Sequence, residues 1–381
     1  MIPLSIAAGV VIIAIVLWEA FEAIVLPRRA TRRFRLNRLV YRSTWVPWRA
    51  LARRMPRAKL RETFLGVYGP LSLLLLFVLW AALIVLGFGM LDWAAAHAAG
   101  PVHPPPSFPT CLYLSGTTFF TLGLGDVSPN GWPERWLTVA ESGLGFGFFA
   151  LVFSYLPVIY QAFSRREVNI VLLDARAGSP PTAAELLRRH AGADGWRELQ
   201  QLLHSWEHAS ADILESHVSY PAVAYFRSQH NNESWLAALA AILDASALLV
   251  AGVESDCARQ ARLTFAMCRH TVVDLAQLFT AAPPSGLADR LPAPELVRLR
   301  AALADAGYHL RETEAANEKL RKLREMYEPY LASLSRFLLV EIPPWILSQE
   351  VTDNWRTTAW GRISGLDTTA REELSVDDHA D

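Results

Sequence analysis

Three long apolar runs without charged residues lie in the first half of the chain. Ile2–Trp18, Phe64–Leu91 and Ser142–Phe163 contain 17, 28 and 22 residues without Asp, Glu, Lys or Arg. A helix needs roughly 20 apolar residues to cross the hydrocarbon core of a bilayer. The pattern therefore predicts three membrane-spanning helices and excludes a soluble enzyme for this half of the chain.

A shorter apolar stretch lies between the second and third runs. Pro109 suits the first turn of a helix, so we expect a short helix over Thr110–Phe120 that dips into the membrane and ends before two glycines. Gly123 and Gly125 can take left-handed conformations, which lets successive carbonyl groups point the same way. A ring of such carbonyls can replace the hydration shell of a monovalent cation.

The second half of the chain has the pattern of a helical bundle. Trp235–Val253 has only Asp244 as a charged residue and is long enough to raise the question of a fourth span. We expect a buried bundle helix instead, because the acid is central and no basic residue flanks the run. The other helices expected are Trp196–His217, Asp256–Thr280, Pro294–Ala306 and Arg311–Val340, the last kinked or divided at Pro329.

The distribution of charge predicts how the chain crosses the membrane. The net charge is only −1, which gives no indication of a nucleic-acid partner, but Pro27–Thr63 carries 13 basic residues and one acid. Asp92–Arg135 has a single basic residue, and Arg165 and Arg166 follow the third run. The positive-inside rule then predicts an external N-terminus and a cytoplasmic C-terminal half.

The predicted fold class is an all-α membrane protein. Arg35, Arg38 and Arg42 would face anionic lipid headgroups from an amphipathic surface segment. No span carries a regular ladder of Arg residues, so we expect no voltage sensor. The expected parts are an N-terminal transmembrane helix (1–26), a basic cytoplasmic loop (27–63), a module of two spans with the short helix between them (64–163), a helical cytoplasmic domain (164–360) and a disordered tail (361–381).

The sequence Thr118-Phe-Phe-Thr-Leu-Gly-Leu-Gly-Asp126 resembles the T-x-x-T-x-G-Y-G-D signature of potassium channels with a single pore loop. The resemblance implies an outer helix, a pore helix, a selectivity filter and an inner helix over Phe64–Phe163. It also implies roles for single residues. These are potassium coordination by Thr121, Leu122, Gly123, Leu124 and Gly125, support from Thr117 and Thr118 on the pore helix, and Asp126 at the outer mouth.

Two positions depart from the family's pattern. Leu124 stands where the family usually has Tyr, and it lacks the hydroxyl that helps to hold the filter's width. A weakly selective monovalent cation channel is therefore an alternative to a potassium-selective one. Thr117 stands where some members carry Glu, so Asp126 could instead pair with the Tyr113 hydroxyl.

One filter segment per chain supplies a quarter of a fourfold ring, so we expect a homotetramer. In the family, a glycine midway along the inner helix acts as a hinge and a proline near its cytoplasmic end bends the gate, which points to Gly145 and Pro157 here. Close packing through small residues is the alternative for Gly145.

Glu141 either hydrogen-bonds behind the filter or reaches the membrane surface. We expect the protein to lie in a bacterial inner membrane. We also expect a regulatory ligand, which the sequence does not identify.

His204-Ser-Trp-Glu-His208 matches the H-x-x-E-H pattern, which places two imidazoles one turn apart on a helix with a carboxylate between them. A membrane-anchored metalloprotein using His204, Glu207 and His208 is thus a hypothesis of another class, with a solvated helix face as the ordinary alternative. We expect no enzyme and no cofactor, only K⁺ as the permeant ion. The odd number of cysteines argues against a disulfide framework.

Overall fold

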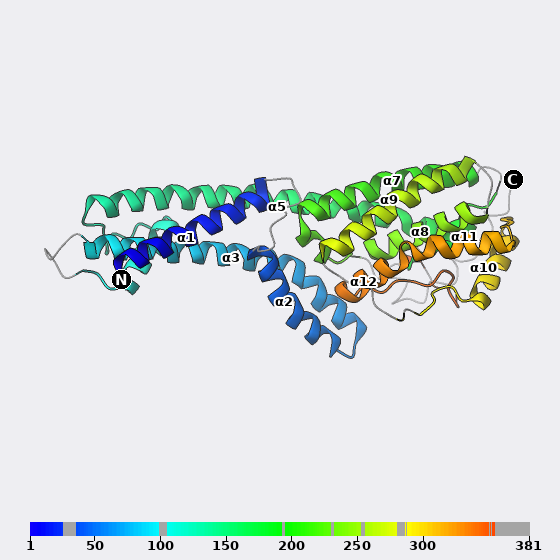
Figure 1. Cartoon of the computed structure of the whole chain (residues 1–381), viewed down its shortest axis with the longest axis horizontal. Helices are drawn as coiled ribbons and strands as arrows, with labels where there is room; N and C mark the ends of the chain where they lie inside the picture. The colour runs from blue at the N-terminus through cyan, green and yellow to red at the C-terminus, as the bar shows by residue number, and fades with distance from the viewer. Residues whose placement is uncertain are drawn as a thin grey trace, which may run out of the picture. The chain divides into compact units, whose positions relative to one another are not determined.

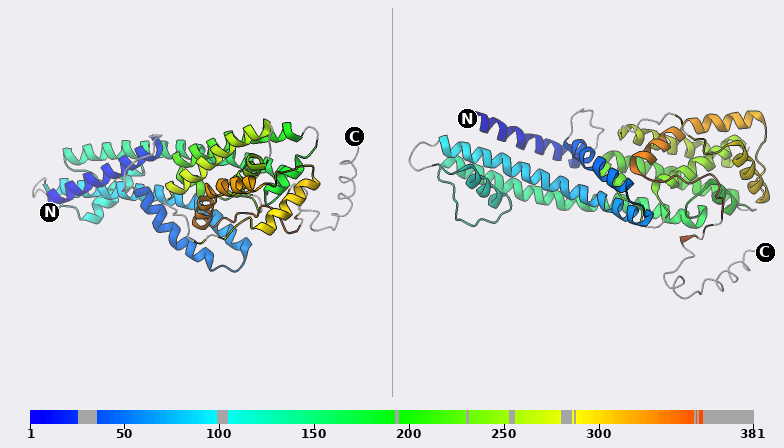
Figure 2. Two further views of the ribbon diagram at one scale, coloured as in Figure 1. Left: turned by 45° about the vertical axis from the view of Figure 1, so that its right-hand side comes forward. Right: turned by 90° about the horizontal axis from the view of Figure 1, so that it is seen from below.

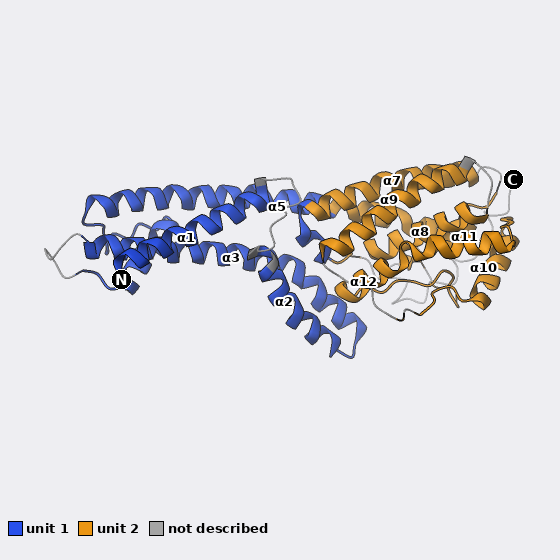
Figure 3. Ribbon diagram, in the orientation of Figure 1, with its two compact units in different colours: residues 1–163, 219–226 blue, residues 164–218, 227–381 orange. Residues whose placement is uncertain are grey.

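The computed structural model describes residues 1–25, 36–98, 105–192, 195–229, 232–252, 256–279, 286, 288–349, 351, 353 and 354. These residues form helices joined by turns (Figures 1 and 2), so the predicted all-helical class is confirmed. The chain divides into two compact units, which Figure 3 colours separately. Unit 1 comprises residues 1–163 and 219–226, and unit 2 comprises residues 164–218 and 227–381.

Unit 1 contains the three apolar helices that the hydropathy pattern predicts. Its elements are α1 (Ile2–Ala20), the π-helical turn η1 (Phe21–Val25), α2 (Leu36–Arg53), α3 (Ala58–Ala98), α4 (Phe108–Phe119), α5 (Trp132–Ala177) as far as Phe163, and the 3₁₀ turn η2 (Pro221–Tyr225).

Two of these helices are longer than predicted. The second apolar helix begins at Ala58 rather than Phe64, and α5 continues to Ala177 rather than ending at Phe163. The reason is that an uncharged run marks only the part of a helix inside the apolar layer. Backbone hydrogen bonding continues through the charged residues beyond it.

The basic loop contains the amphipathic helix α2. Arg35 and the neighbouring Arg28 and Arg29 lie outside the described residues, as does the side chain of Arg38. Arg42 is exposed on α2.

Helices α1 and α3 cross at two glycines. A Cβ added at Gly9 would lie 2.7 Å from the carbonyl oxygen of Gly87, and one added at Gly87 would lie 2.7 Å from Cγ1 of Ile13. Close to this crossing, the Ser5 hydroxyl donates to the Met90 carbonyl at 3.0 Å. The extra N-terminal helix therefore packs backbone to backbone on α3.

Eight residues of the second half of the chain belong to unit 1. The segment Ser219–Phe226 brings Tyr225 between α2 and α3. The Tyr225 ring lies 5.7 Å from that of Tyr41, 5.0 Å from that of Trp45 and 5.2 Å from that of Tyr68, measured between centroids. This corrects the prediction of one uninterrupted domain over residues 164–360. The aromatic residues of this segment can be buried in either unit, and their sequence does not say in which.

Unit 2 is a helical bundle. Its helices are α6 (Ala183–Arg189), α7 (Gly195–Ser219), α8 (Trp235–Gly252), α9 (Asp256–Leu278), α10 (Ala293–Asp305), α11 (Glu314–Glu325) and α12 (Glu328–Leu338). The predicted helix Arg311–Val340 is divided into α11 and α12, with Pro329 in the first turn of α12. This position suits a residue that has no N–H to donate.

Helix α8 is the core of unit 2. By length and composition α1, α3, α5 and α8 could each cross a membrane, but 94% of the apolar window of α8 is buried inside the protein, against 22% for α1 and 17% for α5. Its apolar surface is thus already covered by other helices, as expected for a buried bundle helix.

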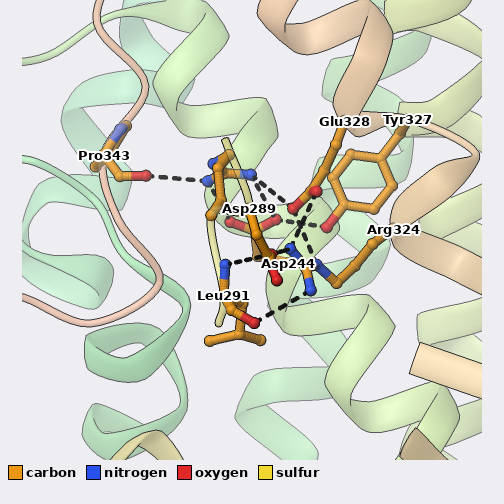
Figure 4. Close-up of polar contacts among 8 residues, drawn as sticks. Asp244, Asp289, Leu291, Arg324, Tyr327, Glu328 and Pro343 are labelled. Atoms are coloured by element: carbon orange, nitrogen blue, oxygen red, sulfur yellow. Dashed lines mark hydrogen bonds and ion pairs between the residues drawn. The ribbon is translucent and has the colours of Figure 1, made fainter. Parts of the chain in front are cut away.

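The central acid of α8 is paired within this bundle (Figure 4). Asp244 accepts hydrogen bonds from Arg290 Nη2 at 2.8 Å and from the Tyr327 hydroxyl at 2.5 Å. Arg290 also donates to the Pro343 carbonyl at 3.0 Å and lies 3.5 Å from Glu328. A buried charge is tolerated when it is paired and hydrogen-bonded in this way.

Candidate functional site

The short helix α4 positions the segment that follows it. Ser107 caps its N-terminus by accepting a hydrogen bond from the Thr110 amide, and Pro109 lies in its first turn. The helix therefore begins at Phe108, two residues before the predicted start, and ends at Phe119. At its end the Phe120 amide donates to the Gly116 carbonyl at 3.0 Å.

Left-handed residues alternate along the segment after α4. The φ angles of Thr121, Gly123 and Gly125 are 55°, 56° and 79°. Leu122 donates its amide to the Thr117 carbonyl at 2.8 Å, so the backbone is tied to the end of α4. Alternating backbone handedness brings successive carbonyls to one side of the chain.

The carbonyl oxygens of this segment are available as acceptors. Among the residues that the structure describes, no hydrogen bond ends on a carbonyl of Thr121 to Gly125. Leu122 and Leu124 are 61% and 62% exposed in a single copy of the chain. The segment thus offers a row of carbonyl oxygens that this copy does not use.

The other residues predicted for this site lie around it. Thr117 and Thr118 are buried on α4, and the Thr117 hydroxyl donates to the Leu114 carbonyl at 2.9 Å. Asp126 is exposed, and it interacts with the Tyr113 hydroxyl. The pairing of Tyr113 with Asp126 is the one expected from the sequence.

Gly145 of α5 packs against the end of α4. A Cβ at Gly145 would come well within 3.0 Å of the Phe119 carbonyl oxygen, whereas nothing lies within 4 Å of a Cβ at Gly143 or Gly147. Gly145 therefore has a packing role, and its role as a hinge stays a prediction. Pro157 lies inside α5, which continues past it as a helix.

Two buried carboxyl groups lie behind α4, and sequence reasoning singled out only one of them. Glu141 is 1% exposed and contacts Ser115 of α4, so it does not reach the membrane surface. Asp92 is 2% exposed and interacts electrostatically with Glu141. Asp92 follows directly on an apolar run, where an acid is usually an interfacial residue, so its burial had no sequence signal.

The H-x-x-E-H motif lies on the surface of α7. The rings of His204 and His208 lie 4.8 Å apart, and Gln260 donates to Glu207 at 2.7 Å. Further along α7, His217 is fully buried and Asp212 pairs with Arg165, so neither is available as a third metal ligand beside this motif.

Within the described part of the chain, no three His, Cys, Asp or Glu side chains are grouped to hold a metal ion. Cys111, Cys257 and Cys268 are free and buried. Burial raises the pKa of the Cys257 thiol to about 11, which makes it a poor nucleophile.

Comparison with known proteins is consistent with this geometry. Residues 72–161 match the model of a family described as ion channels, so this part of the chain is an ion-channel domain. That family consists of channels and not of enzymes.

A curated relative is the uncharacterized membrane protein YdjJ of Bacillus subtilis (strain 168), which is 24% identical over 193 residues. These residues are 50% of this chain and 55% of the relative, so the chain spans about half the length of the curated relative that it matches. No solved structure gives a significant match.

Proposed function

We propose that the protein is a potassium channel that conducts K⁺ passively across a membrane. The observation that carries the proposal is the alternation of left-handed residues at Thr121, Gly123 and Gly125, with unused carbonyls, inside an ion-channel domain. The carbonyl oxygens of Thr121 to Gly125 would replace the water around K⁺. Asp126, held by Tyr113, would lie at the outer mouth.

The pore would be formed by four copies of the chain. A single copy contributes one row of carbonyls, which is a quarter of a fourfold ring. Support comes from α5, where Phe146, Phe153 and Tyr160 recur every seven residues and are 72%, 70% and 63% exposed. A stripe of large exposed side chains on one helix face is suited to contact with other copies or to lining a pore.

The chain would lie in a bacterial inner membrane with its N-terminus outside and unit 2 in the cytoplasm, as the positive charge of the 27–63 loop favours. Anionic lipids would bind this loop, and conduction would not depend on voltage, because no span carries an Arg ladder. Steep voltage dependence in a planar bilayer, or equal activity in neutral and anionic lipid, would contradict these two points.

Flux through the purified full-length protein in liposomes tests the function. We expect potassium flux from the native chain and its loss in Gly123→Ser, because a side chain at φ 56° strains the backbone by about 1–2 kcal/mol. Gly286→Ser is the matched control, since Gly286 also has a positive φ of 71° with nothing within 4 Å, but lies in unit 2. Equal flux from native and Gly123→Ser proteins would refute the filter.

The same preparation distinguishes the alternative raised by Leu124. A reversal potential near that of K⁺ in mixed K⁺ and Na⁺ gradients supports a potassium-selective channel. A reversal potential near zero means a weakly selective cation channel.

A further inference from the structure

The side chain of Ser115 joins three helices behind the carbonyl segment. Its hydroxyl oxygen lies 2.5 Å from Oε1 of Glu141 on α5 and 2.8 Å from the carbonyl oxygen of Val85 on α3. Ser115 itself is on α4, and it is fully buried. These two contacts hold α4 between its neighbours, about one turn before α4 ends at Phe119.

The two contacts of Ser115, with Glu141 and with Val85, need two protons between them. If Glu141 is ionised, only the proton of the Ser115 hydroxyl is present. A serine hydroxyl has one proton to donate, and a carbonyl oxygen and a carboxylate can only accept. If Glu141 were ionised, Ser115 could donate to Glu141 or to Val85, but not to both. Both contacts are satisfied when protonated Glu141 donates to Ser115 and Ser115 donates to Val85.

The surroundings of Glu141 disfavour a negative charge. Its second carboxyl oxygen, and both carboxyl oxygens of Asp92 on α3, have no hydrogen-bond partner among the described residues. No described Arg, Lys or His forms an ion pair with either group. The other titratable groups near Asp92 are the Cys111 thiol of α4 and Glu134 of α5. Buried carboxylates with no counter-charge are costly, and two that interact are more so.

We propose that Glu141 acts as a positioning residue in its protonated form and fixes α4, and with it the filter, between α3 and α5. Loss of this proton breaks the chain of hydrogen bonds from Glu141 through Ser115 to Val85. Conduction then falls as the pH rises. The inference rests on the proposed channel function for its effect on conduction, but not for the protonation of Glu141.

The first test measures potassium flux in liposomes from neutral to alkaline pH, with equal pH on both sides. Native flux should fall roughly three- to tenfold at alkaline pH, the effect of one neutral hydrogen bond. Glu141→Gln keeps a donor for Ser115 and should conduct without the alkaline fall, whereas Glu141→Ala should show reduced flux at every pH. A native profile without the fall, or an unchanged fall in Glu141→Gln, would overturn the proposal.

Glu134→Gln is the matched control on the same helix. Glu134 accepts hydrogen bonds from the Asn130 and Gly131 amides at 2.7 and 3.2 Å, and an amide oxygen can accept them too. This variant should keep the alkaline fall. If the fall disappears in Glu134→Gln, the titrating group is not Glu141.

Infrared difference spectroscopy tests the protonation without any flux. The native protein at neutral pH should show a C=O stretch of a protonated carboxyl group that Glu141→Gln lacks, beside any such band from Asp92. Its absence from the native protein would refute the proposal even if the channel conducts. If the band is present in a preparation without potassium flux, the protonation of Glu141 is supported. The missing flux then counts only against the channel function.

Discussion

The carbonyl group of Phe119, at the end of α4, occupies the space that a side chain at Gly145 of α5 would need. Gly145→Ala should therefore destabilise the protein by about 1–3 kcal/mol and reduce flux, because overpacking displaces the end of α4. Gly143→Ala and Gly147→Ala are matched controls on the same helix, with nothing within 4 Å of the added Cβ. Thermal unfolding of all three in detergent, beside their flux, checks this; equal stability would contradict the packing role.

Gly87 should be required for α1 to pack on α3. In Gly87→Leu the side chain would overlap Ile13 and the backbone at Gly9, so the two helices should separate. Disulfide formation between cysteines introduced at Ser5 and Met90 measures the contact, and we expect its yield to fall. Gly116→Leu is a control on α4, where the nearest atom to an added Cβ is 3.9 Å away. An unchanged yield in Gly87→Leu would show that α1 tolerates a looser crossing.

The ion pair inside unit 2 should be essential for its stability. Asp244→Asn removes the main counter-charge of Arg290 and should cost about 1.5–3 kcal/mol, because a hydrogen bond between charged groups is lost while Arg290 keeps Glu328 at 3.5 Å. Glu318→Gln, which removes a pair with Arg321 in which both side chains are substantially exposed, should change the stability far less, because solvent screens an exposed ion pair. Denaturant unfolding followed by circular dichroism compares the two. Equal losses would mean that the Asp244 pair contributes no more than a surface pair.

The folded protein should lose stability in acid because of His217. Burial, and then the charge of Arg166, hold the pKa of His217 well below its usual value. The unfolded imidazole gains a proton below about pH 6.5 while the folded one does not, so this group should lower the free energy of unfolding by about 1.4 kcal/mol per pH unit below that point.

Unfolding experiments between neutral and acidic pH check this effect. His217→Asn should reduce the slope without abolishing it, because burial also lowers the pKa of His190. His208→Asn is the control, since His208 is exposed on the same helix and should leave the slope unchanged. A native protein with no loss of stability in acid would contradict the prediction.

The parts of the fold that could be predicted depend on local physics. The uncharged runs identify α1, α3 and α5 because a membrane helix must be apolar along its length, and Pro109 indicates α4 because its ring suits a first turn. Gly123 and Gly125 have the positive φ angles expected of them. The positive φ of Thr121 had no such signal, since a β-branched residue avoids this conformation unless its surroundings impose it.

The contacts that could not be predicted join residues far apart in the chain. Ser115 is an ordinary small residue by sequence, and only its distance from Glu141 gives it a role. Likewise, the pattern around Tyr225 predicts that the ring is buried but not that its neighbours are Tyr41 and Trp45. Hydropathy reports how much of a side chain is hidden, and it does not report which partner hides it.

The position of Ser219–Phe226 among the helices of unit 1 has a consequence for biosynthesis. The part of α5 that belongs to unit 1 ends at Phe163, but Tyr225 is made 62 residues later. At ~5–20 residues per second, a ribosome needs roughly 3–12 s to reach it. During that interval the rings of Tyr41, Trp45 and Tyr68 have no Tyr225 to cover them. Unit 1 would therefore remain unfinished until α6 and α7 of the following bundle have been synthesised.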